Sequence, residues 1–156
     1  MTTPLGELHY RNLLVAIDGS RSAELALRGA VTVARRDNAR VTLLCVAPDV
    51  VAEASRWPSL APIPDQRDAD TVADKILRES VARIPEDIPV TTLLRRGRPG
   101  PEIVAAAKEA PYDAILLGAR GVGRVEALIG SVSQYVMHHA DIAVFVAHAP
   151  SDEDHG

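Results

Sequence analysis

The sequence predicts an α/β protein in which a parallel sheet of five strands is covered by helices on both faces. Five short, almost continuously apolar runs follow one another along the 156 residues, and helical patterns separate most of them. Strands buried on both faces have this apolar pattern, and parallel strands need crossover connections, which are right-handed. With 47% hydrophobic residues, a chain of this length is able to build a core of its own.

The first strand and the first helix follow from a clear local pattern. The apolar run Asn12–Ile17 predicts a strand, and the Asp-Gly-Ser turn at 18–20 ends it. A helix is expected to follow to about Arg36, with Ser20 or Ser22 as its N-cap. Its apolar stripe consists of Ala23, Leu27, Ala30 and Ala34.

The region after the second strand is the irregular part of the chain. Val41–Ala47 predicts that strand, whereas the segment from Pro48 to about Arg67 contains four prolines and no periodicity. We expect a flexible loop at about 48–68, because connections this long are usually functional or mobile. The next helix is expected at Ala69–Ile84.

The second half of the chain continues the alternation of strands and helices. Three more strands are predicted at Val90–Arg96, Ala114–Leu117 and Ile142–Ala147. One helix is expected to run through Glu109 with Pro101 in its first turn, and a shorter one from Gly130-Ser131 to about His139. Neither a linker nor an internal repeat interrupts the pattern. The whole chain, 1–156, is therefore expected to form one domain, with its core at about 12–148 and a frayed acidic tail at 150–156.

Composition and charge argue against several classes of function. A net charge of −4 and 3% of aromatic residues leave little to neutralise a phosphate backbone or to stack on bases, so we expect no nucleic-acid binding. No uncharged apolar run reaches the roughly 18 residues that span a bilayer, and the N-terminus lacks the pattern of a secretion signal. The single cysteine, Cys45, cannot form an internal disulfide and fits a reducing compartment. We therefore expect a cytoplasmic protein with no membrane partner.

Patterns for catalysis and for metal binding are sparse. The sequence contains no GKS or GKT of a P-loop, no GxSxG elbow, and no HExxH or CxxC spacing for zinc. A dinucleotide fingerprint would follow the first strand, where only Asp-Gly-Ser stands. His138 and His139 are adjacent, so on a helix they point about 100° apart and make a poor metal pair. Neither a catalytic residue nor a metal site is predicted.

The loop after the fourth strand is the candidate binding loop. Ligands of open parallel sheets bind beyond the carboxyl ends of strands, so the loops after strands one, two and four are the ones to search. Glycines let backbone N–H groups approach an anion, and a helix start favours negative charge. The residues of this candidate phosphate cradle are Gly118, Arg120, Gly121, Gly123, Arg124, Gly130, Ser131 and Ser133. The alternative interpretation is a glycine-rich surface loop followed by an ordinary serine N-cap.

Two other polar sites also have two interpretations each. Asp18 ends the first strand and faces the same crevice, where its carboxylate would accept from ribose hydroxyls or hold a metal ion through water. The alternative is that Asp18 caps the first turn of the helix together with Ser20. The Arg-Arg-Gly-Arg run at 95–98 is either an anion patch or a solvated edge.

Three segments of the chain resemble the universal stress protein family. They are Val15–Leu27 (VAIDGSRSAELAL), Thr42–Ala47 (TLLCVA) and, most specific, Asp113–His148. The resemblance covers about 12–148 and implies a Rossmann-like, three-layer sandwich of the HUP type, with five parallel strands in the order 3-2-1-4-5. Strands one and four are neighbours in that order, so Asp18 and the loop that begins at Gly118 would share one crevice.

The same resemblance implies ATP binding. In the ATP-binding branch of the family, a Gly-x2-Gly-x9-Gly-Ser/Thr pattern follows the fourth strand. The resemblance implies that the phosphates are held by Gly118, Gly121, Gly130 and Ser131, with Val132 and Ser133 beside them, the ribose by Asp18, and the base by the backbone of Val46, with Ala16 lining the pocket. ATP, with or without Mg²⁺, is the expected cofactor, and AMP or another adenine nucleotide is the alternative.

The chain departs from this family pattern in two places. Eight residues, Val122–Ile129, lie between Gly121 and Gly130 where the pattern has nine, and Ala119 stands where a serine is common. The shorter loop changes the reach of the chain by up to ~3.5 Å, which either removes one phosphate contact or is absorbed by a tighter turn. Two functions therefore stay open: an ATP-binding stress-response regulator or sensor, and an interaction module of the same fold that binds no nucleotide.

The sequence also allows expectations about enzymatic activity and about assembly. Activity beyond slow ATP hydrolysis is not expected, because no general base or water-positioning residue is evident. Members of the family commonly dimerise through the last strand, and Ile142–Ala147 would be an exposed apolar edge unless it pairs with another copy. We therefore expect a homodimer through 142–147.

Overall fold

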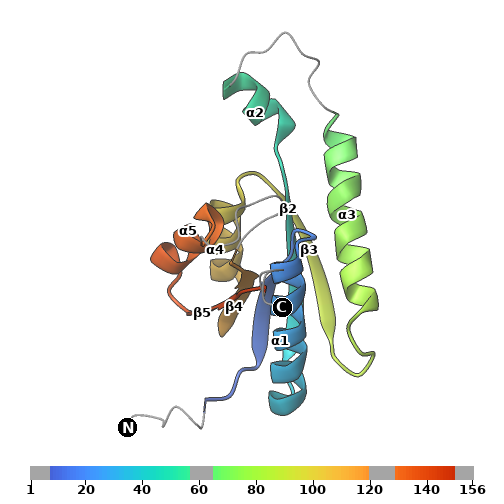
Figure 1. Cartoon of the computed structure of the whole chain (residues 1–156), viewed down its shortest axis with the longest axis vertical. Helices are drawn as coiled ribbons and strands as arrows, with labels where there is room; N and C mark the ends of the chain where they lie inside the picture. Colours follow the sequence, from blue (N-terminus) through green and yellow to red (C-terminus); the bar gives the residue numbers. More distant parts are fainter. Residues whose placement is uncertain (1–7, 57–64, 120–128, 150–156) are drawn as a thin grey trace, which may run out of the picture.

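A five-stranded parallel sheet forms the centre of the computed structural model, which describes residues 8–56, 65–119 and 129–149 (Figure 1). The strands are β1 (Asn12–Ala16), β2 (Arg40–Ala47), β3 (Val90–Arg96), β4 (Ala114–Gly118) and β5 (Ala143–Ala147). Their order across the sheet is β3-β2-β1-β4-β5, and all neighbouring pairs are parallel. The predicted fold class and strand order are confirmed.

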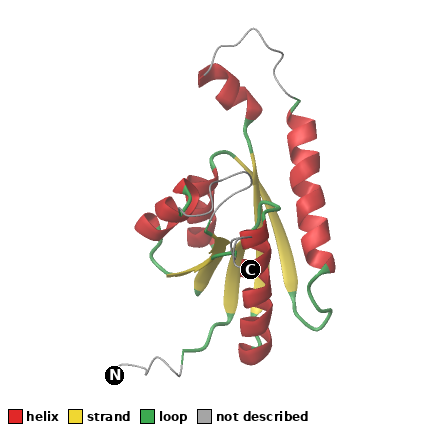
Figure 2. Cartoon of the chain, viewed as in Figure 1, coloured by secondary structure: helices red, strands yellow, loops and turns green. Residues whose placement is uncertain are grey.

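Helices cover both faces of the sheet (Figure 2). They are α1 (Arg21–Asp37), α2 (Val50–Arg56), α3 (Gln66–Ala82), α4 (Pro99–Glu109) and α5 (Ser131–His139). α1 and α3 pack on one face, and α4 and α5 pack on the other. α2 contacts α3 and extends past the edge of the sheet, next to the carboxyl end of β2 (Figure 1).

Side chains of the strands contribute to two separate apolar cores, one on each face of the sheet. Successive side chains of a strand point to opposite faces, so Leu13 and Val15 face α1 and α3 whereas Leu14 faces α4 and α5. β2 repeats the alternation with Leu43 and Leu44, which are both fully buried. Burial on both faces is the reason that these strands read as continuous apolar runs.

The segment 48–68, predicted as a loop, contains helical structure at both of its ends. α2 lies near its start, and α3 begins before its end. The Gln66 side chain joins the two helices, because it accepts from the N–H of Val50 at 3.1 Å and donates to the carbonyl of Pro48 at 2.9 Å. A seven-residue helix has little stability of its own, so α2 depends on such contacts. Residues 57–64 lie outside the described residues.

The start of one helix differs from the sequence-based expectation. α3 begins before Ala69, because Asp65 is its N-cap and accepts from the N–H of Arg67 at 2.9 Å. α4 begins at Pro99, so Pro101 lies in its first turn as expected.

The described helices include none that is long and apolar enough to cross a membrane. The predicted acidic tail at 150–156 lies outside the described residues.

Candidate functional site

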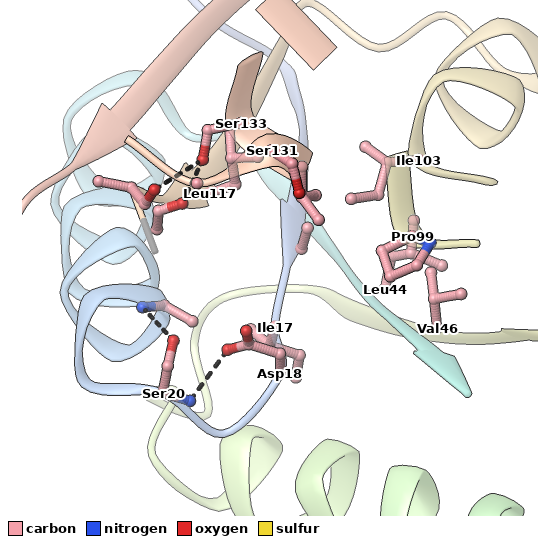
Figure 3. A pocket seen from close by; sticks show the side chains of 16 residues that line it. Ile17, Asp18, Ser20, Leu44, Val46, Pro99, Ile103, Leu117, Ser131 and Ser133 are labelled. Atoms are coloured by element: carbon pink, nitrogen blue, oxygen red, sulfur yellow. Dashed lines mark hydrogen bonds between the residues drawn. The ribbon is translucent and has the colours of Figure 1, made fainter. Parts of the chain in front are cut away.

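A pocket of about 120 Å³ lies at the carboxyl edge of the sheet, where β1 and β4 run side by side (Figure 3). The strand order changes direction between these two strands, which makes this edge the topological switch point. The lining comes from the ends of β1, β2 and β4 and from the beginnings of α1, α4 and α5. The lining residues are Ala16, Ile17, Asp18, Ser20, Ala23, Leu44, Val46, Pro99, Ile103, Leu117, Gly118, Ala119, Gly130, Ser131, Val132 and Ser133.

Asp18 lies in the tight turn that connects β1 to α1. Its Oδ1 accepts from the N–H of Ser20 at 2.9 Å, and the Ser20 hydroxyl accepts from the N–H of Ala23 at 3.2 Å as the N-cap of α1. Asp18 therefore stabilises the turn that leads into the N-cap residue, and Ser20 itself caps the first turn of α1. A carboxylate has about four lone-pair positions, so one N–H bond leaves capacity for a ligand in the pocket that Asp18 also lines.

Gly118, at the end of β4, lies directly under the first turn of α1. A Cβ atom at this position would lie 2.6 Å from the backbone nitrogen of Ala23 and even closer to the hydroxyl of Ser22. Backbone at this distance cannot give way without moving α1. The packing of α1 against β4 therefore requires a glycine at position 118. This requirement is independent of the phosphate contact that the sequence predicts for Gly118.

Hydrogen bonds tie the start of α5 to the end of β4. The N–H of Gly130 donates to the carbonyl of Ala119 at 2.6 Å. The hydroxyl of Ser133, only 1% exposed, donates to the carbonyls of Gly118 at 2.8 Å and of Ala119 at 3.1 Å. A hydroxyl has one hydrogen, so Ser133 holds α5 in place and is not available as the extra hydroxyl donor that the sequence predicts.

The N-terminus of α5 lines the pocket, and no cap for its first N–H groups is present among the described residues. Gly130 is the N-cap, and no side chain of the described residues makes a capping bond to this helix. The first intrahelical bond runs from the N–H of Gln134 to the carbonyl of Gly130, so the N–H groups of residues 131–133 have no partner within the helix. Three convergent N–H groups and the positive end of the helix dipole form a site that favours an anion.

The opposite side of the pocket is apolar. Leu44 and Val46 of β2 face Pro99 and Ile103 of α4, and Figure 3 shows these four side chains gathered away from Asp18 and Ser131. We call these four residues the apolar end of the pocket. Asp18 and the first turn of α5 form its polar end. A ligand that fits both ends has a flat or apolar group on one side and an anionic group on the other.

Charge around the pocket is sparse in the part of the chain that the structure describes. Asp18 is the one charged side chain among the lining residues named above. On the other face of β2, burial raises the pKa of the Cys45 thiol to about 11, and the nearby Asp18 charge adds to the rise. The thiol is therefore neutral at pH 7 and behaves as a buried apolar residue. Within the described residues, no cluster of His, Cys, Asp and Glu is suited to a metal ion.

Eight of the ten residues predicted for the nucleotide site line this one pocket. They are Ala16, Asp18, Val46, Gly118, Gly130, Ser131, Val132 and Ser133. The other two, Arg120 and Gly121, lie outside the described residues, as do Gly123 and Arg124. The shortened stretch between the second and third motif glycines falls largely within the same segment.

The sequence analysis missed the contribution of α4. Pro99 and Ile103 line the pocket, but the loop after the third strand was not among those expected to bind a ligand. The four-residue spacing of Pro99 and Ile103 places them on one face of a helix. An apolar pair at a helix start has no signal of its own in a sequence, because core residues show the same pattern.

Comparisons with known proteins agree on one family. A family model described as the universal stress protein family matches residues 9–148. A putative universal stress protein of Staphylococcus haemolyticus is 32% identical over 146 residues, which cover 89% of this chain and 85% of that protein. Universal stress protein YxiE of Bacillus subtilis is 29% identical over 145 residues, which cover 88% of this chain and 98% of that protein.

Solved structures share the fold over almost the whole chain. Universal stress protein UspA from Lactobacillus plantarum has a TM-score of 0.73 at 26% identity, covering 91% of this chain and 100% of that one. A universal stress protein from Archaeoglobus fulgidus in complex with dAMP has a TM-score of 0.66 at 24% identity, covering 90% of this chain and 99% of that one. A family member from Arabidopsis thaliana with AMP bound has a TM-score of 0.67 at 20% identity, covering 92% of this chain and 94% of that one.

Proposed function

Because this chain belongs to the universal stress protein family, we propose that its pocket binds an adenine nucleotide and that the protein acts as a nucleotide-dependent regulator or sensor in the cytoplasm. The observation that carries the proposal is the uncapped N-terminus of α5 at the polar end of the pocket. Family members from Archaeoglobus fulgidus and Arabidopsis thaliana have been solved with dAMP and AMP, which supports the ligand class.

The geometry supports one orientation of the nucleotide. A phosphate group accepts from the N–H groups of residues 131–133, where the helix dipole favours negative charge. The ribose lies beside Asp18, whose carboxylate accepts from a ribose hydroxyl. The base lies at the apolar end, between Val46 and Pro99, and its edge is read by backbone groups.

ATP, with or without Mg²⁺, is the nucleotide that we expect, and AMP is the alternative. Arg120 and Gly121 would add to the phosphate site if they approach it as the family pattern implies. We propose binding without rapid turnover, with slow hydrolysis of ATP as the upper limit. In this proposal, nucleotide occupancy is the signal that the protein reports.

Titration of nucleotide-free protein tests the proposal. We expect saturable binding of ATP or AMP at one site per chain in isothermal titration calorimetry, with and without Mg²⁺. Ser131→Ala is the first variant to compare, since it removes one hydroxyl at the polar end and keeps the N–H groups. No heat signal at millimolar concentrations of either nucleotide would contradict the proposal.

A second candidate function is an interaction module of the same fold that binds no nucleotide. Two structural observations favour it: Gly118 is needed for packing against α1, and the Ser133 hydroxyl is used by β4. Both residues would therefore be retained in a protein without a ligand. An empty protein whose partner binding is unchanged in Ser131→Ala would support this second function.

We further propose that two copies associate through β5. This strand is at the edge of the sheet, and Phe145 on it is 44% exposed. An edge strand presents unpaired backbone groups to a second copy. Light scattering after size exclusion should give a dimer, and replacing Val144 by proline should shift it to the monomer because proline removes a ladder donor. A wild-type monomer at tens of micromolar would contradict this assembly.

A further inference from the structure

Two adjacent arginines on β3, Arg95 and Arg96, point to opposite faces of the sheet. Arg95 pairs in register with Val46 of β2, and Arg96 pairs with Ala47. Successive residues of a strand point to opposite faces, so Arg95 faces α4 and Arg96 faces α3. The ion pairs agree with this: Arg95 contacts Glu102 and Glu109 of α4, and Arg96 contacts Asp70 of α3. Neither arginine of this pair is the free anion patch that the sequence allowed.

The guanidinium of Arg95 spans two turns of α4. Its Nε donates to Glu102 Oε2 at 3.2 Å, and its Nη1 donates to Glu109 Oε2 at 2.7 Å, while its Nη2 donates to the other oxygen of Glu109. Glu102 and Glu109 are seven residues apart, so both lie on the same face of the helix. The side chain of Arg95 is only 20% exposed and that of Glu102 30%, whereas the Glu109 side chain is 56% exposed, so the contact with Glu102 is the better shielded of the two. One side chain of β3 thus contacts α4 at two positions that are two turns apart.

The start of α4 is fixed by the same cluster. The N–H of Gly97 donates to the carbonyl of Ala47 at 3.0 Å, and Gly97 has a φ of 141°. A Cβ atom at Gly97 would lie 2.9 Å from Glu102 Oε1, so the turn from β3 into α4 packs against the carboxylate that Arg95 holds. This turn leads directly to Pro99, the first residue of α4.

The two sides of the apolar end of the pocket are therefore joined through Arg95. Val46, the register partner of Arg95, lies on one side. Pro99 and Ile103, the first and fifth residues of α4, lie on the other side, and Arg95 holds this helix through Glu102.

We propose that Arg95 is a positioning residue for ligand binding: through Glu102 and Glu109 it sets the width of the apolar end and so the affinity for the base of a nucleotide. The inference rests on the proposed nucleotide-binding function and deepens it. Arg95 does not touch the ligand. α4 also packs against Tyr135 of α5, but bonds between α5 and β4 hold the polar end in addition, so we expect the effect to fall mainly on the base.

The fold does not depend on these contacts of Arg95. Ile103, Val104 and Ala106 bury α4 in the apolar core whether or not Arg95 is present. Arg95→Met keeps the length and the apolar stem of the side chain and removes the guanidinium. Arg96→Met is the matched control, since it removes the neighbouring guanidinium from the opposite face of the same strand.

Three probes separate the two ends of the pocket in the full-length protein. AMP contains base, ribose and phosphate, adenosine lacks the phosphate, and ribose 5-phosphate lacks the base. We expect Arg95→Met to weaken AMP and adenosine by the same factor, about two- to thirtyfold, and to leave ribose 5-phosphate unchanged. Glu102→Gln should give a smaller loss, because the contact of Arg95 with Glu109 remains, and the double variant should lose no more than Arg95→Met alone, because Glu102 acts through Arg95. Arg96→Met should bind all three probes as the wild type does.

Three outcomes overturn the inference. Equal weakening of ribose 5-phosphate in Arg95→Met would show a general loosening of the pocket rather than a positioning of its apolar end. Unchanged AMP affinity in Arg95→Met, in a wild type that does bind AMP, would refute the role of Arg95 and leave the proposed function intact. A wild type that binds none of the three probes and no ATP would refute the proposed function itself.

Discussion

Replacing Gly130 by aspartate should stabilise α5 and at the same time remove anion binding. Gly130 is the N-cap of this helix, with φ −67° and ψ 159°, a conformation that aspartate adopts readily. An aspartate there would accept from an N–H of the first turn that has no partner within the helix. The cap contributes a few tenths of a kcal/mol over glycine, and its charge at the helix N-terminus about 0.3–1 kcal/mol. The melting temperature should rise by about 1–4 °C.

The same side chain would occupy the phosphate site. A hydrogen bond from N–H to a charged phosphate contributes about 1.5–3 kcal/mol, and the new carboxylate would displace at least two of them and repel the ligand. A loss of about 3 kcal/mol corresponds to more than a hundredfold weaker binding. Thermal melting and calorimetric titration with AMP measure the two effects on the same sample. A gain of stability with a loss of binding is a combination that misfolding cannot produce.

Gly130→Asn is the matched control. Asparagine caps a helix as well as aspartate does but carries no charge, so it should give the same cap contribution and a smaller loss of affinity. If Gly130→Asp bound AMP as tightly as the wild type, the phosphate would not lie at α5, and the orientation proposed above would be wrong.

Three further predictions concern the stability of the fold and the burial of its core. Gly118→Ala should destabilise the protein by about 1–3 kcal/mol in urea denaturation, because its Cβ would collide with Ser22 and force α1 outward; an unchanged midpoint would refute that role. Cys45, with its pKa raised to about 11, should react with iodoacetamide at pH 8 only after unfolding, and fast labelling of the native protein would contradict its burial. The hydrogen bond from Arg36 lowers the pKa of Asp37, so the stability that Asp37 contributes is present above the usual pKa of aspartate and is lost as the pH falls toward its lowered value. Asp37→Asn should thus lower the melting temperature at pH 7, and the difference from wild type should shrink below about pH 4; a difference that stays constant from pH 6 to pH 3 would exclude this linkage.

The parts of the fold that the sequence predicts well are those that local pattern determines. Strands such as β2 are buried on both faces, so their apolar composition shows directly in the sequence. The start of α1 is similarly local, since Ser20 caps it through a bond within four residues. α2 was not predicted because the contacts that hold it come from Gln66, which is distant in sequence. A contact between residues this far apart leaves no periodic pattern in the sequence.

The candidate site was predicted in part for the same reason. Motif glycines and serines have a sequence signature, and Gly130 and Ser131 do lie at the pocket. The signature does not distinguish a residue that binds a ligand from one that packs, and Gly118 and Ser133 have packing roles that only the structure shows. Pro99 is apolar and therefore carries no functional signal at all.

The nucleotide content of the purified protein tests the central claim most directly. The protein would be denatured, and the supernatant analysed by chromatography and mass spectrometry, with Gly130→Asp purified in parallel. We predict an adenine nucleotide in the wild-type sample, up to one per chain, and none in the variant. A wild-type protein that is empty, and that stays empty after incubation with millimolar ATP or AMP, would contradict the account and leave the interaction module as the function of this fold.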